Sequence, residues 1–152
     1  MNTRYLTIIA VLAGAAIAGA GVFYWTNSPS HARQLDVQRG AVVYADYCAS
    51  CHGTNLEGQP NWRTRLPSGK LPAPPHDATG HTWHHPDRQL FAITKYGSAA
   101  IVGNNYESDM AGFWESLSDD EIWDVLAYIK SQWPERERTV QERITRQSEA
   151  GG

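Results

Sequence analysis

The sequence predicts an all-α domain of short helices and long loops, preceded by a single N-terminal transmembrane helix. Three observations favour this fold class. Residues 5–25 carry no charged side chain, two later segments have apolar residues at helical spacing, and the stretch between those two is rich in proline and glycine. No segment alternates apolar and polar residues strongly enough to predict a β-strand. A chain of 152 residues has the length of about one domain.

The composition excludes several classes of protein. Charged residues make up 19% of the chain and apolar residues 41%, which excludes an intrinsically disordered tail. The net charge is −3 and the pI is about 6.0, which excludes binding of nucleic acid through a basic surface. Only two cysteines are present, so no disulfide framework holds the fold together.

The first segment, residues 1–25, is predicted to be a membrane anchor in the lipid bilayer. A helix over residues 5–25 spans about 31 Å, close to the thickness of the hydrocarbon core. Arg4 precedes this helix, and the aromatic run Phe23–Trp25 ends it at the expected lipid–water boundary. The positive-inside rule then predicts a single pass through a bacterial inner membrane, with the following domain in the periplasm.

A cleaved signal peptide is the alternative for this segment. Residues 16–18 and 18–20 both fit the small-residue pattern of a cleavage site. The apolar stretch of a signal peptide is usually ~7–15 residues long, and this one is longer, which favours an anchor that is retained. Residues 26–34 are predicted to be a short polar linker. Both interpretations export the rest of the chain.

The domain that follows, residues 35–134, begins with a predicted helix over residues 35–48. Small and apolar residues recur there at helical spacing. They are Val37, Gly40, Ala41, Tyr44 and Cys48. Residues 53–85 show little periodicity and contain many prolines and glycines, so they are predicted to form an ordered loop.

A second, shorter helix is predicted after this loop. It starts at Pro86, which suits the first position of a helix, and runs to Lys95. Gly97 is expected to end it, because glycine is common just beyond the last turn. Residues 98–113 are predicted to be another loop.

The strongest helical signal precedes Pro134, which is expected to end the last helix of the domain. Ser118 and Glu121 have the spacing of a capping box. Apolar residues then repeat at intervals of three and four: Ile122, Val125, Leu126, Ile129 and Trp133. The charged tail, residues 135–152, has only one weak apolar pair and is predicted to be a marginal helix or disordered.

One short motif carries the chemistry. Cys48, Cys51 and His52 form the pattern C-x-x-C-H at the end of the first predicted helix. Two thiols at this spacing reach the two vinyl groups of a haem as thioethers, and the next histidine ligates the iron. A thioredoxin-like redox pair would instead follow a β-strand. A cysteine–zinc site would usually have a second closely spaced pair of ligands.

A haem iron has a second axial position. Its candidate ligands are one methionine and five histidines: Met110, His31, His76, His81, His84 and His85. Apart from the initiator, Met110 is the only methionine, and it lies in a loop shortly before the last predicted helix. A thioether stabilises ferrous iron, so ligation by histidine and methionine raises the reduction potential. The alternative is a methionine that fills a gap in the core, and the position of Met110 favours the ligand.

Together these features resemble a class I cytochrome c with a membrane anchor. The run GAVVYADYCASCHG, a long loop, a methionine and the run LSDDEIWDVLAYIKSQWP occur in the order typical of that family, over roughly residues 35–134. The resemblance implies one covalently attached haem c. The residues that would attach it or ligate its iron are Cys48 and Cys51 as thioethers, His52 as the proximal ligand and Met110 as the distal ligand. The sequence departs from the family at Ala111, where a proline commonly follows the methionine.

The resemblance also implies supporting contacts around the haem. Gly40 and Tyr44 would cross against Tyr128 on the last helix, where the small residue lets two backbones approach. A proline carbonyl would accept the hydrogen bond from the proximal histidine and fix its tautomer. Pro75 is the preferred candidate for that carbonyl, and Pro74 is the alternative.

The polar residues of the long loop have two interpretations. Guanidinium and indole N–H groups suit carboxylates, so the candidates to bind the haem propionates are Trp62, Arg63, Arg65, Trp83 and the histidines. The alternative is a packed loop with solvated arginines. The histidines between His76 and His85 are candidates for binding copper or zinc, although loop histidines more often pack and form hydrogen bonds.

Charge is distributed unevenly over the predicted domain. Residues 36–133 contain twelve acids and seven bases, a net charge of −5. Three bases lie in the loop after the motif, whereas seven acids lie near Met110 and the last helix: Glu107, Asp109, Glu115, Asp119, Asp120, Glu121 and Asp124. Such a bipolar surface orients the encounter with an oppositely charged partner.

The predicted function is the transfer of single electrons between redox complexes of a respiratory or photosynthetic membrane. The expected partners are a quinol-oxidising complex, a terminal oxidase or a reaction centre. Two alternatives stay open. One is a permanent haem c subunit of a larger membrane oxidoreductase, and the other is a haem enzyme or sensor with an open iron site. The single C-x-x-C-H motif excludes the two-haem peroxidases.

Overall fold

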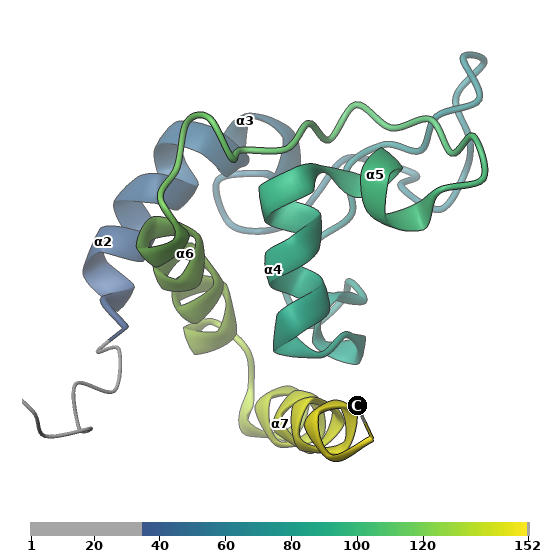
Figure 1. The fold of residues 1–152 in the computed structure, drawn as a ribbon. Coiled ribbons are helices and arrows are strands. Elements are labelled where there is room, and N and C mark those ends of the chain that lie inside the picture. The colour runs from purple at the N-terminus through teal and green to yellow at the C-terminus, as the bar shows by residue number, and fades with distance from the viewer. Residues whose placement is uncertain (1–34, 152) are drawn as a thin grey trace, which may run out of the picture. The chain divides into compact units, whose positions relative to one another are not determined.

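The described part of the protein is all-helical (Figure 1). The computed structural model describes residues 35–151, which belong to one compact unit. No β-strand occurs among these residues, in agreement with the predicted fold class. Their helices in chain order are α2 (Val37–Val43), the π-helix η1 (Tyr44–Cys48), α3 (Ala49–His52), the 3-10 turn η2 (Thr82–His84), α4 (Asp87–Tyr96), α5 (Ser98–Val102), α6 (Asp119–Ser131) and α7 (Glu135–Ala150).

The predicted anchor and linker, residues 1–25 and 26–34, lie outside the described residues. Among residues 35–151, no helix combines the length and the apolar character that crossing a bilayer requires. The membrane anchor therefore stays a prediction from the sequence.

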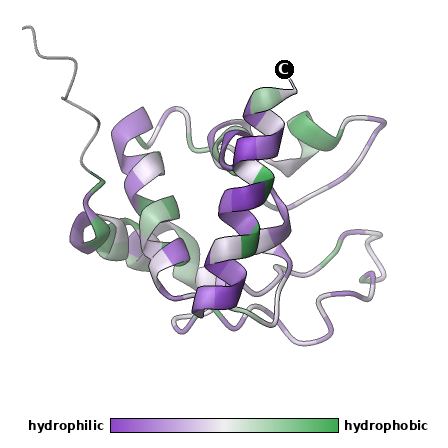
Figure 2. Ribbon diagram, turned by 90° about the horizontal axis from the view of Figure 1, so that it is seen from below, coloured by the Kyte–Doolittle hydropathy of each residue, from purple (hydrophilic) through white to green (hydrophobic). Residues whose placement is uncertain are grey.

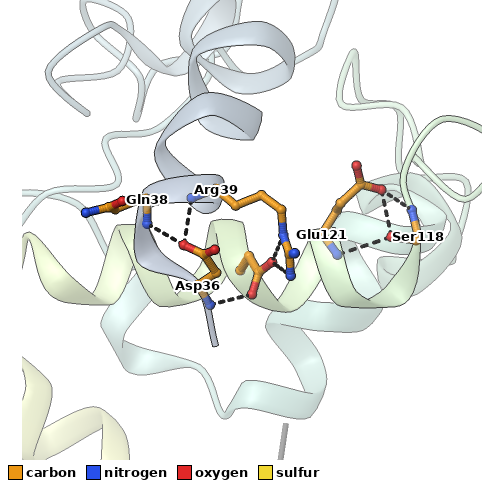
Figure 3. Close-up of polar contacts among 6 residues, drawn as sticks. Asp36, Gln38, Arg39, Ser118 and Glu121 are labelled. Atoms are coloured by element: carbon orange, nitrogen blue, oxygen red, sulfur yellow. Dashed lines mark hydrogen bonds and ion pairs between the residues drawn. The ribbon is translucent and has the colours of Figure 1, made fainter. Parts of the chain in front are cut away.

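The first helical run starts at a side-chain cap and continues to the end of the C-x-x-C-H motif. A carboxylate oxygen of Asp36 accepts hydrogen bonds from the backbone N–H groups of Gln38 (3.0 Å) and Arg39 (2.9 Å), as Figure 3 shows. The run passes from α2 through η1 into α3 and ends at Gly53. The helix predicted over residues 35–48 is therefore confirmed, and it is four residues longer at its C-terminal end.

Helix α2 crosses α6 so closely that the two backbones touch. A Cβ atom at Gly40 would lie 2.0 Å from the carbonyl oxygen of Asp124 and 3.0 Å from the Cβ of Tyr128. One turn beyond Gly40, at the start of η1, the ring of Tyr44 packs against that of Tyr128 with their centroids 5.4 Å apart. The predicted crossing of Gly40 and Tyr44 against Tyr128 is confirmed.

A buried carboxylate holds the same crossing from its polar side. Asp124 on α6 is 1% exposed, and it accepts a hydrogen bond of 2.8 Å from the backbone N–H of Asp36. The guanidinium of Arg39 donates to the other carboxylate oxygen and forms an ion pair with it. Figure 3 shows these contacts between α2 and α6. A buried carboxylate needs such partners, because leaving water without them is costly.

Helix α6 has the cap and the apolar face that the sequence predicts. The N–H of Ser118 donates to the Glu121 carboxylate (2.8 Å), and the Ser118 hydroxyl oxygen accepts from the Glu121 N–H (3.3 Å). The Ser118 hydroxyl (2.7 Å) and then the Ser118 backbone N–H donate to the Glu121 carboxylate, and these two bonds lower the pKa of Glu121. The predicted apolar face is buried in the core: Ile122, Val125, Leu126, Ile129 and Trp133. The helix ends at Ser131, shortly before Pro134.

The middle of the chain differs from the prediction in two ways: one helix begins a residue later, and one predicted loop contains a helix. Helix α4 begins at Asp87, and Pro86 is its extended N-cap residue rather than its first helical residue. Gly97 ends α4 with a φ of +85°, as predicted, because glycine adopts this conformation without strain. The prediction of a loop throughout residues 98–113 was wrong, since α5 occupies Ser98–Val102. Five residues without a buried side chain give no apolar period to detect.

The charged tail is a well-formed helix, so of its two predicted states the helix is observed and disorder is wrong. Gln141 of α7 is fully buried and donates to the Asp87 carboxylate (2.6 Å) and to the His85 carbonyl (3.2 Å). The N–H of Asp87 donates in turn to the Thr145 hydroxyl (3.1 Å). Figure 2 shows that α7 carries mostly hydrophilic residues. Because its docking contacts are polar, an apolar pattern could not reveal them.

The crossing of α2 and α6 predicts a specific sensitivity at Gly40. Gly40→Ala places a methyl group into the backbone of α6, so we expect it to lower the free energy of unfolding by about 1–3 kcal/mol. Chemical unfolding followed by circular dichroism measures this change. Gly151→Ala is the control, because its Cβ would meet nothing nearer than an oxygen at 3.5 Å. Equal stability of the two variants would contradict the close approach.

Candidate functional site

The C-x-x-C-H motif lies where the first helical run ends. Cys48 closes η1, and Cys51 and His52 lie in the single turn of α3. Both cysteines are free thiols, with Cys48 half-buried and Cys51 exposed. Burial, and then the neighbouring Cys51, raise the pKa of Cys48 to about 11. The Tyr44 hydroxyl donates to the Gly53 carbonyl (2.9 Å), which ties the end of the motif back to the helix.

His52 is buried and presents one ring nitrogen for ligation. Its Nδ1 lies 2.8 Å from the Pro74 carbonyl oxygen, which can only accept, so Nδ1 carries the proton. Its Nε2 receives no hydrogen bond from the described residues. Burial lowers the pKa of His52, although the bond to Pro74 opposes this effect. A neutral imidazole with a fixed tautomer and an unbonded Nε2 is what a metal ligand requires.

The carbonyl that fixes His52 belongs to Pro74, so the preferred candidate, Pro75, was wrong. Pro75 is buried, and its carbonyl oxygen lies against Gly80, where a Cβ atom would approach it to 2.0 Å. The ring of Pro75 lies against Gly58, where a Cβ atom would approach the Pro75 nitrogen to 2.4 Å. The two glycines thus fix the direction of the loop at Pro75 and leave only the carbonyl of Pro74 facing His52.

The loop of residues 53–85 is ordered, as predicted. Backbone hydrogen bonds link Gly58 to His52 (2.7 Å), Gln59 to Ala73 (2.9 Å) and His76 to Leu56 (2.8 Å). The first bond ties the start of the loop to the end of α3, and the other two join residues far apart in the loop and bring its two arms together. The order therefore comes from specific long-range pairs rather than from regular secondary structure.

His76 lies flat against His52. The two ring centroids are 3.9 Å apart and the planes differ by 24°. The Nδ1 of His76 lies 2.8 Å from the Thr82 hydroxyl, and its backbone carbonyl accepts from the Trp133 indole N–H at 2.6 Å. Burial, followed by the neighbouring His52 and His81, lowers the pKa of His76 well below its usual value. His76 therefore packs on the motif histidine, which the sequence did not indicate.

Met110 is held against the junction of α4 and α5. Its sulfur lies 3.3 Å from the Ser98 hydroxyl, and its backbone N–H donates to the Ser108 hydroxyl (3.1 Å). The loop passes so close to Gly97 that a Cβ there would lie 3.0 Å from the Met110 carbonyl oxygen. Ser98 was not among the predicted site residues, because nothing in the sequence indicates that it faces a methionine twelve residues away.

Trp62, Arg63 and Trp83 are packed within the loop region in this structure. The Arg63 guanidinium lies 4.1 Å from the centre of the Trp62 ring, and Trp62 in turn stacks on His81. The Trp83 indole N–H donates to the Ala78 carbonyl (3.3 Å). Arg65 likewise donates to the Gly69 carbonyl (2.5 Å). Each of the four thus has a contact within the chain, and their role as propionate donors stays a prediction.

The described histidines of the loop have other neighbours than a metal-binding cluster. Among residues 35–151, no group of three or more histidine, cysteine or acidic side chains is arranged to hold a metal ion. His81 and His85 lie nearby, with ring centroids 5.4 Å apart, and His84 stacks on Trp83 at 3.6 Å. His31 lies outside the described residues.

The predicted acidic surface is partly neutralised by pairing. Asp109 forms an ion pair with Lys70 (2.5 Å) and Asp119 with Lys95 (2.6 Å). Asp124 is not a surface residue at all, since it is buried against Arg39. The surface charge near Met110 is therefore smaller than the sequence predicts.

The donor set suits a covalently attached haem. Two free thiols lie within one helical turn, beside a neutral imidazole whose Nε2 has no hydrogen-bond partner among residues 35–151. A half-buried thioether is available from Met110. Soft sulfur and imidazole nitrogen are the donors found on haem iron in electron-transfer proteins. These residues therefore fit a haem c.

Comparison with known proteins gives the family. Residues 37–133 match the family Cytochrome c, so the chain belongs to the cytochrome c family. Cytochrome c-555 of Prosthecochloris aestuarii is 25% identical over 105 residues, which cover 65% of this chain and 90% of that protein. No solved structure matches. Membership of the family implies a covalent haem c and an electron carrier rather than an enzyme.

Proposed function

We propose that this protein is a single-haem electron carrier whose iron is closed on both sides. Cys48 and Cys51 are the proposed thioether sites, His52 is the proximal ligand and Met110 the distal ligand. The observation that supports this assignment best is the environment of His52, which is buried, neutral and fixed by Pro74, with no hydrogen bond to Nε2 from the part of the chain that the structure describes.

When bound, haem c supplies an iron that gains and loses one electron. The chain contributes a rigid environment around it. The bond to Pro74 holds the tautomer and the direction of His52, and the contacts of Met110 with Ser98 and Ser108 hold the thioether in place. Leu117 is buried, and Phe113 packs against the core, so both help to exclude water on the side of Met110. An iron that His52 and Met110 would hold, with little access for water, would suit reversible electron transfer.

Met110→Ala tests whether the protein is a carrier with a closed iron. We expect the parent ferric protein to show the weak near-infrared sulfur-to-iron band and the ferrous protein to bind carbon monoxide poorly. The variant should lose the band and bind carbon monoxide readily, because an axial position is vacated. Optical spectroscopy of both oxidation states measures this.

The control for that experiment separates attachment from ligation. Met110→Ala should keep its haem stain on a denaturing gel, whereas the double variant Cys48→Ala with Cys51→Ala should lose it. If the parent protein lacks the band and binds carbon monoxide readily at neutral pH, the carrier assignment fails and a haem enzyme or sensor is favoured.

We also propose a docking patch for a redox partner with a basic rim. The patch consists of Tyr96, Ile101, Val102 and Trp114, which are 53%, 38%, 52% and 61% exposed. It adjoins the Met110 loop, because the Trp114 N–H donates to the Lys95 carbonyl (3.1 Å) and Ser98 contacts Met110. Two exposed carboxylates flank Met110 in sequence: Glu107 and Glu115. The proposed partners are a quinol-oxidising complex, a terminal oxidase or a reaction centre.

The exposed carboxylates of Glu107 and Glu115 beside this patch predict a dependence on salt. Oxidation by a cationic cobalt complex should slow as ionic strength rises, since attraction is screened beyond ~10 Å at 0.1 M salt. Glu115→Gln should flatten this dependence more than Glu149→Gln, which removes the same charge on α7. Stopped-flow rates over a range of ionic strength measure the effect. Equal slopes for the two variants would show that only the net charge matters.

Attachment to the inner membrane, with the haem domain in the periplasm, is a further proposal. Its support is the uncharged span of residues 5–25 with Arg4 before it and aromatic residues at its end. The acquisition of haem c is consistent with export of the domain.

Cell fractionation tests the anchor. We expect the protein in the membrane fraction, resistant to extraction by high salt or alkali, with an intact mass that includes residues 1–25. A mature chain that begins near Gly19 or Gly21 and is recovered in the soluble periplasm would instead identify a cleaved signal peptide.

A further inference from the structure

We propose that His76 is a positioning residue that fixes the plane of the His52 imidazole by stacking on it. This inference rests on the proposed role of His52 as the proximal ligand. It adds a residue whose side chain acts on the iron only through another side chain.

The hydrogen bond to Pro74 does not fix the ring of His52 completely. It joins Nδ1 to a carbonyl oxygen at 2.8 Å. Carbonyl oxygens accept over a broad range of directions, so this bond tolerates a change of tilt of the ring. A second ring at 3.9 Å does not tolerate it, because tilting forces atoms on one side into overlap and opens a gap on the other. The stack therefore restrains the motion that the hydrogen bond leaves free.

His76 is itself held firmly enough to act as such a support. Its backbone N–H donates to the Leu56 carbonyl (2.8 Å), and its carbonyl accepts from the Trp133 indole N–H (2.6 Å). Its ring is bonded through Nδ1 to the Thr82 hydroxyl (2.8 Å), and Thr82 is buried. The Tyr44 ring meets it edge-on, with centroids 6.3 Å apart. Contacts with four separate parts of the chain thus fix both its backbone and its side chain.

The plane of an axial imidazole has a measurable consequence. In a low-spin ferric haem, this plane helps to determine which pyrrole rings carry the unpaired spin density. The order and the spread of the haem methyl proton resonances report that distribution. For an unchanged and fixed thioether ligand, a fixed imidazole plane gives a wide spread, and an imidazole that samples several orientations gives a narrower one.

The experiment compares His76→Ala with His84→Ala in the haem-loaded ferric protein by proton NMR. His84 is the matched control, because it is a histidine two residues beyond Thr82 that stacks on Trp83 rather than on His52. We expect His76→Ala to change the order or narrow the spread of the methyl resonances, with the near-infrared methionine band retained. His84→Ala should leave both unchanged. Unchanged methyl resonances in His76→Ala, or an equal change in His84→Ala, would overturn the proposal.

A second pair of variants separates stacking from filling of space. His76→Phe keeps a flat ring against His52, whereas His76→Leu keeps apolar volume without a flat face. We expect the phenylalanine variant to retain the parent order of methyl resonances and the leucine variant to lose it. The same result for both would overturn the stacking role.

The parent protein alone also tests the proposal if no variant at this position retains haem. Its methyl resonances should be widely spread and keep their order over a range of temperature, and a narrow set that changes order would overturn the fixed plane. Loss of covalent haem or of the methionine band in the parent would instead contradict the proposed function. The two failures are therefore distinguishable.

Discussion

The close approach of α2 and α6 at Gly40 is the constraint on which the rest of the structure depends. The Asp124 carbonyl occupies the space that a side chain at Gly40 would fill, and the buried Asp124 carboxylate is neutralised by Arg39. This contact sets the direction in which α2 continues into the C-x-x-C-H turn. At the other end of α6 it places Trp133, whose indole N–H holds the His76 carbonyl. One crossing of two helices thus positions both sides of the environment of the motif histidine.

The long loop between the motif and α4 supplies the groups that contact the motif histidine. It has almost no regular secondary structure, yet it supplies the Pro74 carbonyl and the His76 ring to the same histidine, His52. The close packing of Gly58 and Gly80 against Pro75 fixes the direction of the chain at that point. The loop is therefore ordered by sterics and by a few long-range hydrogen bonds, which suits a site that must move little when its charge changes by one electron.

Helix α7 extends the protein beyond the part that matches the family, which ends at residue 133. It is attached by polar contacts rather than by an apolar face. Gln141 reaches both the Asp87 carboxylate and the His85 carbonyl, and the Lys130 ammonium pairs with Asp87 at 2.8 Å. Through Asp87, these contacts connect the C-terminal helix to the start of α4 and to α6. Through His85, they hold the end of the loop that carries His76.

The sequence by itself determined the features that depend on neighbours in the chain. The spacing of Cys48–His52 and the capping box of Ser118–Glu121 are local, because a few adjacent residues define the geometry. The tertiary structure decided the rest. Pro74 rather than Pro75 bonds to His52, because the packing of Gly58 and Gly80 against the two prolines directs their carbonyls differently. The tertiary structure also placed His76 on the motif histidine and buried Gln141, because partners 24 and 54 residues away in sequence meet only when the chain folds.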